Sequence, residues 1–411
     1  MTGMSFRATL RRKAGAEQHA TTLELFYDLV FVFAITQVSH LLLDDLSWRG
    51  AGRALLVLLV VWWAWNYTTW VTNELDPDSI VVRLVLITVM LGSLLMAVAI
   101  PGAFGGRALL FAGSYVAIQI GRHAFLTWGA AARGTLERER AGRILIWFAA
   151  AAPLWIAGAI VDDPTRTVLW LCALAVDYAA PLVVFRVPGL RPLTHEAWNV
   201  ETSHFAERFQ LFMIIAFGET IVITGATTAE RDIDTATVTA FGLAFLATAA
   251  MWWLYFNYVA AIAQRRLELA PDRTRLARDA YTYLHVVMVA GVILAAVGDE
   301  LVIAHPTEHL SAAEAAAVVG GPALYLVAHA LFRLRLAGTI AWKRLAAALA
   351  CVAVGLLAGV VAALLVGTLV VAVLVGLIVA EHIAALRRRL RGEPSPLERL
   401  EPSTEPSRLG A

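Results

Sequence analysis

The sequence predicts an all-α fold: a polytopic membrane bundle of about twelve transmembrane helices in two parallel six-helix repeats. The first observation behind this prediction is composition. Of the 411 residues, 59% are hydrophobic and 16% are charged, whereas soluble domains contain roughly a quarter charged residues. One soluble core cannot bury so much apolar surface, so we expect the lipid bilayer to be a partner of the chain. The other observations are the spacing of apolar stretches and an internal repeat.

The apolar stretches are long enough to cross a bilayer, which takes about 20 residues of helix. Twelve are found, at residues 23–43, 52–73, 80–100, 107–131, 143–160, 166–186, 205–226, 236–261, 279–303, 313–332, 343–362 and 367–386. The last two are separated by a short turn near Gly367. Residues 1–22 form an N-terminal segment, and residues 392–411, rich in proline and charge, predict a disordered tail.

Charge alternates between successive loops. With the N-terminus inside, the cytoplasmic segments hold most of the basic residues: Arg11, Arg12 and Lys13; Arg133, Arg138, Arg140 and Arg143; Arg265, Arg266, Arg273 and Arg275; Arg335, Lys343 and Arg344; and Arg387, Arg388, Arg389 and Arg391. The opposite loops hold acids such as Asp162, Asp163 and Asp232. The positive-inside rule therefore predicts that both termini are cytoplasmic. The acidic segment 74–78 does not fit this pattern.

The second half of the chain repeats features of the first in the same order. WWAWNY at Trp62–Tyr67 corresponds to WWLYFNY at Trp252–Tyr258, and the pair Tyr115 and Gln119 corresponds to Tyr325 and His329. Six spans in each half is an even number, so both halves have the same orientation. We therefore expect parallel repeats at residues 23–190 and 205–386, as in some transporters.

The first span carries unusual polar residues. Glu24 and Asp28 lie one helical turn apart and share a face, and Gln37 lies near the far end. For Glu24, capping of the helix from Thr21 competes with a functional role. Asp28 lies a turn deeper, where a buried pairing with an arginine of a neighbouring helix fits better.

The seventh span repeats this pattern with Glu207, Arg208 and Glu219. Glu219 lies twelve residues beyond Glu207, which is about 18 Å of helix rise and well inside the hydrocarbon. Its counterpart in the first span is Gln37 or a close neighbour. Two interpretations remain open for Glu219: a hydrogen-bonded group that joins helices, or a proton or cation site.

Other polar groups within spans have simpler interpretations. Arg122 is deep in its span, so we expect it to pair with an acid such as Asp28 or Asp177. Arg208 lies near a helix end, and we expect its side chain to extend toward the membrane surface. Metal-ligand spacings, nucleotide-binding loops and hydrolase motifs are not found, so no cofactor, metal, nucleic-acid partner or enzymatic activity is predicted.

Two sequence motifs suggest a family. The runs HATTLELFYDLVFVFAI at His19–Ile35 and HFAERFQLFMIIAFGETI at His204–Ile221 resemble the two signatures of the bacterial low temperature requirement protein A (LtrA) family. The resemblance extends over residues 19–386 and implies a protein of the bacterial inner membrane linked to growth in the cold. The motif positions are His19, Glu24, Asp28, His204, Glu207, Arg208, Gly218 and Glu219. The family supplies no substrate or reaction.

These observations lead to three functional hypotheses. The first is a transporter of a small solute that alternates access between two halves and is coupled to protons through Glu219 and Asp28. The second is an ion channel whose pore is lined by the first helix of each repeat. The third is a membrane factor in lipid or cold adaptation. We expect a polar cavity in the cytoplasmic half, lined by the first and seventh spans.

Overall fold

A computed structural model describes residue 10 and residues 19–198, 200–257 and 259–401. The regular structure of these residues is helical, which confirms the all-α prediction. The main helices are α1 (Thr22–Leu43), α2 (Trp48–Thr72), α3 (Ile80–Ala99), α4 (Ala108–Ala124), α5 (Leu136–Ile160), α6 (Thr165–Leu182), α7 (Thr202–Ala229), α8 (Thr235–Phe256), α9 (Ala260–Glu268), α10 (Arg273–Leu276), α11 (His285–Ala304), α12 (Ala312–Ala337), α13 (Trp342–Gly355) and α14 (Ala363–Leu390). A π-helical segment, η5 (Ala277–Leu284), joins α10 to α11.

Nine helices of the described residues are long and apolar enough to cross a membrane. They are α1, α2, α3, α5, α7, α12 and α14, together with Thr235–Glu268 and Arg273–Ala304. The chain is therefore a multi-pass membrane protein by the length and composition of its helices. The predicted spans at α4, α6 and α13 are not among these nine, and the helices there have only 17, 18 and 14 residues. Twelve spans thus remain a prediction.

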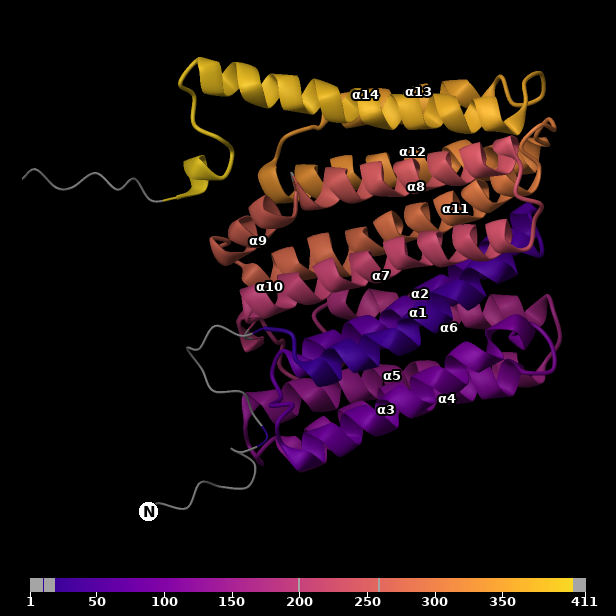
Figure 1. Cartoon of the computed structure of the whole chain (residues 1–411). Helices are drawn as coiled ribbons and strands as arrows, with labels where there is room; N and C mark the ends of the chain where they lie inside the picture. Colours follow the sequence, from indigo (N-terminus) through magenta and orange to yellow (C-terminus); the bar gives the residue numbers. More distant parts are fainter. Residues whose placement is uncertain (1–9, 11–18, 199, 258, 402–411) are drawn as a thin grey trace, which may run out of the picture.

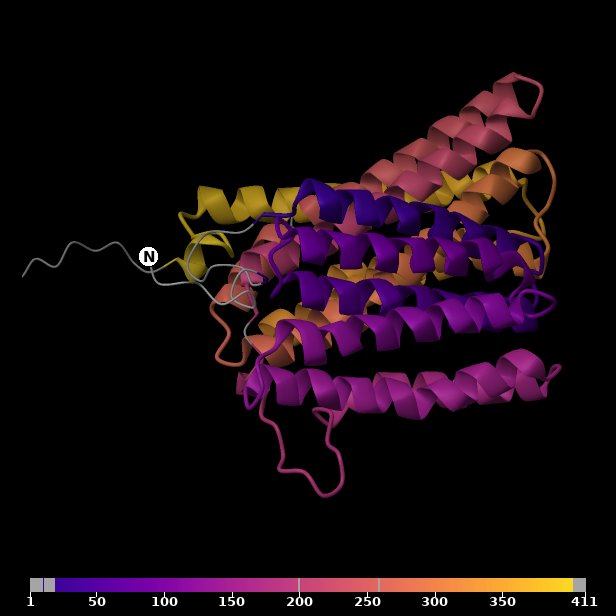
Figure 2. The same ribbon diagram turned by 90° about the horizontal axis from the view of Figure 1, so that it is seen from below.

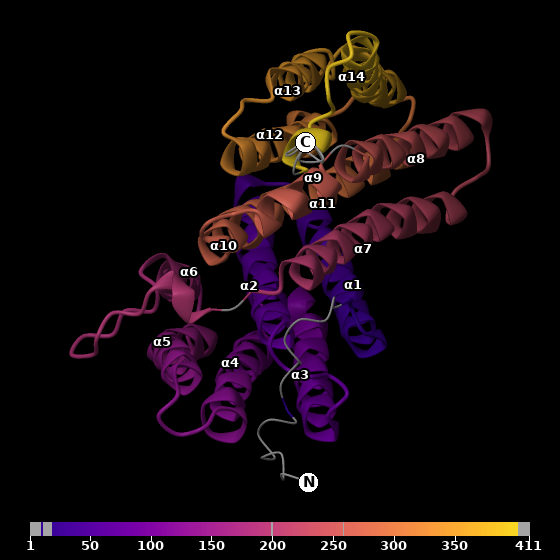
Figure 3. The same cartoon turned by 90° about the vertical axis from the view of Figure 1, so that its left-hand side faces the viewer.

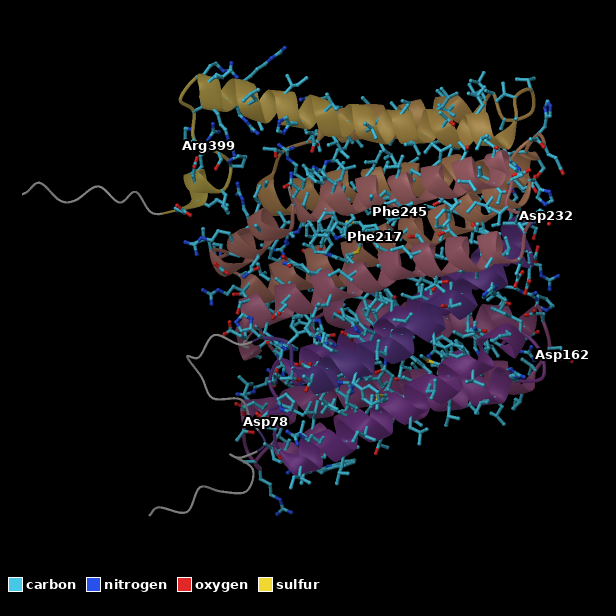
Figure 4. All side chains as sticks on the ribbon, viewed as in Figure 1. Asp78, Asp162, Phe217, Asp232, Phe245 and Arg399 are labelled. Atoms are coloured by element: carbon cyan, nitrogen blue, oxygen red, sulfur yellow. The ribbon has the colours of Figure 1, made fainter. Side chains whose placement is uncertain are left out.

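The helices lie side by side with their axes roughly aligned, as Figure 1 shows, and Figure 3 looks along them. The two ends of the bundle differ in the chain segments they carry. Asp78 and Arg399 lie at one end, and Asp162 and Asp232 lie at the other (Figure 4). The loops predicted to be cytoplasmic and those predicted to lie opposite are therefore separated in space. We call the first of these ends the Arg399 end and the second the Asp232 end.

The acidic segment 74–78, which contradicts the positive-inside pattern, is neutralised locally. Glu74 forms an ion pair with Arg140 of α5, and Asp78 pairs with Arg83 at 2.9 Å. These arginines offset two of the three acids of the segment, Glu74 and Asp78, within the Arg399 end.

The break between α13 and α14 differs from the prediction. α13 ends at Gly355 and α14 begins at Ala363, so the connection lies before Gly367. Gly367 instead lies within α14, where an added Cβ would meet a side-chain methyl of Val302 at 3.5 Å. It is a packing position against α11. Within the predicted tail, residues 398–400 form a short 3₁₀ helix, and residues 402–411 lie outside the described residues.

The first half, α1–α6, and the second half, α7–α14, meet along α1 and α7. In Figure 2, α5 and α6 (magenta) form the outer edge of the first half, and α7 and α8 (rose) extend beyond their neighbours. α1 packs on α2 and α3, and α7 packs on α8 and α11, so both halves use the same kind of contact. α11 and α12 approach closely because Gly321 has no side chain. A Cβ added at Gly321 would lie only 2.3 Å from the Ala295 nitrogen.

Candidate functional site

The beginnings of α1 and α7 are joined by a buried polar contact. Glu24 lies 2.9 Å from His204, measured between Oε1 and Nε2. The other ring nitrogen of His204 lies 3.1 Å from Asn73 Nδ2. Glu24 also completes a capping box with Thr21 at the start of α1. Capping, one of the two interpretations of Glu24, is therefore present, and the same carboxyl group also contacts His204.

One turn deeper, Asp28 and Arg208 form a bidentate ion pair between α1 and α7. We call this interface between the two helices the seam. The Arg208 guanidinium donates to the two Asp28 oxygens at 2.7 and 2.8 Å. Trp65 Nε1 also donates to Asp28 at 2.8 Å. The Arg208 side chain is 0% exposed and that of Asp28 is 3% exposed. The expectation that Arg208 extends toward the membrane surface is wrong, because its acid partner holds it inside the seam.

The two sequence motifs contact each other reciprocally. Just as His204 of the second motif meets Glu24 of the first, His19 of the first lies 3.5 Å from Glu207 of the second. The backbone nitrogen of Ala20 also donates to Glu207 at 2.9 Å. The motifs are therefore two sides of one interface between the halves.

Farther along the seam, Glu219 is fully buried and forms no ion pair among the described residues, although His40 acts on its carboxyl group electrostatically. Its Oε2 accepts a hydrogen bond from Thr36 Oγ1 at 2.5 Å. Its Oε1 has no hydrogen-bond partner. The partner on α1 is thus Thr36, the residue before Gln37. Thr36 and Glu219 stand at matching distances from Glu24 and Glu207, since 36 − 24 and 219 − 207 are both 12.

Arg122 and Asp177 are both buried in the first half but do not pair. Arg122 donates to the Ala64 carbonyl at 3.1 Å, to Thr68 Oγ1 at 2.6 Å and to Gln119 Oε1. Asp177 accepts from Tyr115 and Trp155 at 2.8 and 3.0 Å. The predicted pairing of Arg122 with Asp28 or Asp177 is wrong. Asp28 is already occupied by Arg208, and Asp177 accepts both neutral donors at Oδ2, whereas its buried Oδ1 has no hydrogen-bond partner.

The second half contains a buried arginine in a similar setting, although it is not the repeat counterpart of Arg122. Arg344 of α13 donates to the Leu254 carbonyl at 3.3 Å, and Leu254 holds the place in WWLYFNY that Ala64 holds in WWAWNY. Arg344 also contacts His329 at 2.6 Å, and it binds both oxygens of Glu381 at 3.0 and 3.1 Å. Sequence reasoning placed Arg344 in a loop, but it is only 3% exposed.

A cavity of about 80 Å³ opens near the Arg399 end of the first half. Its wall is mainly apolar and aromatic, with several polar groups from α2, α4, α5 and the start of the second half. The lining includes Asn66, Tyr67, Trp70, Glu74, His123, Arg140, Phe185, His195, Trp198, Arg278 and Thr282. No residue of α1 or α7 lines this cavity. The cavity therefore does not lie between the first and seventh spans, where we expected it. Aromatic packing in the seam, such as Phe31 on Phe212 with ring centroids 6.5 Å apart, explains why.

Comparison with known proteins identifies the family. The family described as Bacterial low temperature requirement A protein (LtrA) matches residues 19–379. The chain belongs to this family. It is also 37% identical over 317 residues to the uncharacterized protein RA0937 of Rhizobium meliloti (strain 1021), which covers 77% of this chain and 78% of the relative. No solved structure matches the chain.

The LtrA motifs thus account for the seam, but several residues that complete it lie outside them. Trp65 and Asn73 of the α2 region bind Asp28 and His204, and neither position shows a signal beyond a Trp-rich helix face. Within the part of the chain that the structure describes, no group of three or more His, Cys, Asp and Glu side chains is placed to hold a metal ion.

Proposed function

We propose that this LtrA protein is a proton-linked transporter of a small solute in the bacterial plasma membrane, with both termini cytoplasmic. The observation that carries the proposal is the Glu219 side chain. It is fully buried where the two halves meet, one of its oxygens binds Thr36, and the other has no partner. An intramembrane carboxyl group that forms no ion pair is a functional site by default, because burying its charge is costly.

Asp28 differs from Glu219 and serves mainly to hold the seam together. Its two oxygens are occupied by Arg208 and Trp65. An acid in such a pair exchanges protons only if the pair separates. We therefore assign the coupling proton to Glu219 and assign Asp28 to a joint between the halves.

A route to Glu219 leads from the Asp232 end. His40, which is exposed near the end of α1, and Glu300 of α11 lie close enough to act on the Glu219 carboxyl group electrostatically. A proton that arrives through His40 would reach Glu219 without passing the Asp28–Arg208 pair. Solute would then reach the opposite end through the cavity in the first half when the halves rearrange.

The similar packing of the two halves favours a transporter over the alternatives. α1 on α3 corresponds to α7 on α11, and the α4–α5 contact corresponds to α12–α13, as expected for parallel repeats that move against each other. A channel lined by α1 and α7 would need the aromatic seam to open, since Trp65 and Phe212 rings lie 4.3 Å apart there. No observation specifically favours a role in lipid modification.

The proposal is tested by proton movement in proteoliposomes. Vesicles carrying a pH-sensitive dye would be clamped electrically with potassium and valinomycin and challenged with panels of small organic solutes. We expect a solute in the panel to acidify the lumen in the wild type. The Glu219→Gln variant should lose this acidification yet keep solute-dependent tryptophan fluorescence. Glu230→Gln, an exposed acid at the end of α7, is the matched control. Unchanged acidification in Glu219→Gln, or none for any solute in the wild type, would contradict the proposal.

A further inference from the structure

The first half contains a buried cation that its own residues do not neutralise. Arg122 is 1% exposed, and its hydrogen bonds go to a backbone carbonyl, a hydroxyl and an amide oxygen. In residues 19–198, 200–257 and 259–401, no carboxylate lies within ion-pair distance of its guanidinium. A buried charge is costly unless an opposite charge accompanies it.

Unused hydrogen-bond donors surround this cation. Arg122 Nε, Gln119 Nε2 and the Tyr67 hydroxyl have no partner, although these side chains are only 1%, 0% and 6% exposed. The Arg122 guanidinium carbon lies 5.7 Å from the centre of the Tyr67 ring, and Gln119 binds Arg122 directly. Each buried donor without a partner costs roughly 1–3 kcal/mol, so three in one place indicate a missing acceptor.

We propose that Arg122, Gln119 and Tyr67 form a binding site for one small anion. Both features are satisfied by the same ligand, because an anion accepts several hydrogen bonds and neutralises the guanidinium. A water molecule would satisfy donors without neutralising the charge. The ligand is either an inorganic monovalent anion or the carboxylate group of an organic solute. The inference does not depend on proton-linked transport.

The cavity near the Arg399 end reaches the Tyr67 side of this site, whereas Arg122 and Gln119 are not among its lining residues. Tyr67 and His123, which follows Arg122 in α4, both line the cavity. Arg140 and Arg278 also lie in its wall, each paired with an acid: Arg140 with Glu74, which lines the cavity too, and Arg278 with Asp279. The apolar and aromatic remainder of the wall suits the apolar part of a carboxylate solute that places its charged group at Arg122.

The test measures thermal stabilisation of the purified, full-length protein by anions. Melting would be followed by tryptophan emission while sodium sulfate, whose anion is divalent, is replaced by sodium chloride, or by sodium acetate, at constant ionic strength. Anything that binds only the folded protein raises the melting midpoint in a saturable manner. We expect saturable stabilisation by at least one anion. A response to chloride alone assigns an inorganic anion, and a response to acetate assigns a carboxylate.

Three variants separate the site from general salt effects. Arg122→Met should abolish the saturable response, and Tyr67→Phe, which removes only the unpartnered hydroxyl, should weaken apparent affinity about tenfold. Tyr281→Phe is the control, because it removes another buried, unpartnered phenol that belongs to the second half. If Arg122→Met does not fold, Tyr67→Phe alone decides. No saturable response in the wild type, or an equal response in Tyr67→Phe, would overturn the proposal.

Discussion

Arg122 of the first half and Arg344 of the second half have similar hydrogen-bond partners, but only one of the two guanidinium groups is paired with an acid. Each is buried, and each donates to the backbone carbonyl at the same position of a Trp-rich helix, Ala64 or Leu254. Each also contacts a residue that lies one helical turn after a tyrosine. Arg122 contacts Gln119, which follows Tyr115, and Arg344 contacts His329, which follows Tyr325. Only Arg344 has an acid, because Glu381 binds it through both oxygens.

The same kind of hydrogen-bonding environment therefore holds one arginine that is neutralised inside the protein and one that is not. Arg344 is neutralised within the protein, so it joins α13 to α14 and leaves no requirement for a ligand. Arg122 has the same backbone contact but no carboxylate, so its neutralisation must come from outside. The Asp28–Arg208 pair in the seam is a third case, in which the neutralising acid comes from the other half of the chain.

The largest expected effect comes from removing a fully neutralised arginine. Arg208→Met leaves the Asp28 carboxylate buried without its cation. Breaking a buried pair in this way costs about 3–5 kcal/mol, so the melting midpoint of the detergent-solubilised protein should fall sharply. Arg83→Met is the control, because the Arg83–Asp78 pair is largely exposed and should contribute little. Equal losses for the two variants would show that the seam pair contributes no more than a surface pair.

The next effect would make the second half resemble the first. Glu381→Gln leaves Arg344 buried without an acid, so we expect a loss of about 2–3 kcal/mol of stability. The same variant should acquire an additional saturable stabilisation by chloride or acetate. Glu401→Gln, at an exposed position beyond α14, should change neither quantity. A Glu381→Gln protein as stable as the wild type would show that Arg344 does not need the Glu381 carboxylate.

A converse substitution would make the first half resemble the second. Thr68 accepts from Arg122 at 2.6 Å and from Tyr27 at 2.9 Å, so Thr68→Asp places a carboxylate against the guanidinium. We expect stability near that of the wild type, because the new ion pair offsets burial of the acid, and we expect anion stabilisation to disappear. Thr68→Asn is the uncharged control and should keep that stabilisation. Retained anion dependence in Thr68→Asp would contradict the explanation based on charge.

The smallest effect concerns a surface counterpart of these pairs. Asp163 lies between α5 and α6. Partial burial raises its pKa, but hydrogen bonds from Thr167 and Arg53 outweigh burial and hold the pKa below the ordinary value of 3.8. Its stabilising contribution is therefore complete above pH 3.8 and is lost as the pH falls through the lowered value.

Asp163→Asn should accordingly flatten the dependence of the melting midpoint on pH below about pH 3.8, by about a degree. Asp162→Asn is the control, since the Asp162 side chain is fully exposed. A pH profile of Asp163→Asn that follows the wild type would show that Arg53 and Thr167 do not stabilise the charged form.

Features that depend on neighbouring residues in the sequence were predicted better than contacts between side chains of different helices. Apolar length and loop charge indicated a helical membrane protein, and a threonine before Glu24 indicated a helix cap, because these features are local. The partner of Asp28 was expected on a neighbouring helix but was Arg208, not Arg122. Such pairings depend on how helices dock, and periodicity carries no information about that. Arg344 was missed for a related reason: an arginine near the start of a helix looks like a loop charge until a neighbouring acid is located.

The most direct test of the central claim is to locate a bound anion. A crystal structure of the full-length protein grown in sodium bromide, with diffraction data collected at the bromine absorption edge, would show bromide by its anomalous scattering. We predict an anomalous peak within hydrogen-bond distance of Arg122 Nε and the Tyr67 hydroxyl, and none beside Arg344. An empty position at Arg122 in both the bromide crystal and a second crystal grown in sodium acetate, or bromide bound equally at both arginines, would contradict a small-anion site at Arg122.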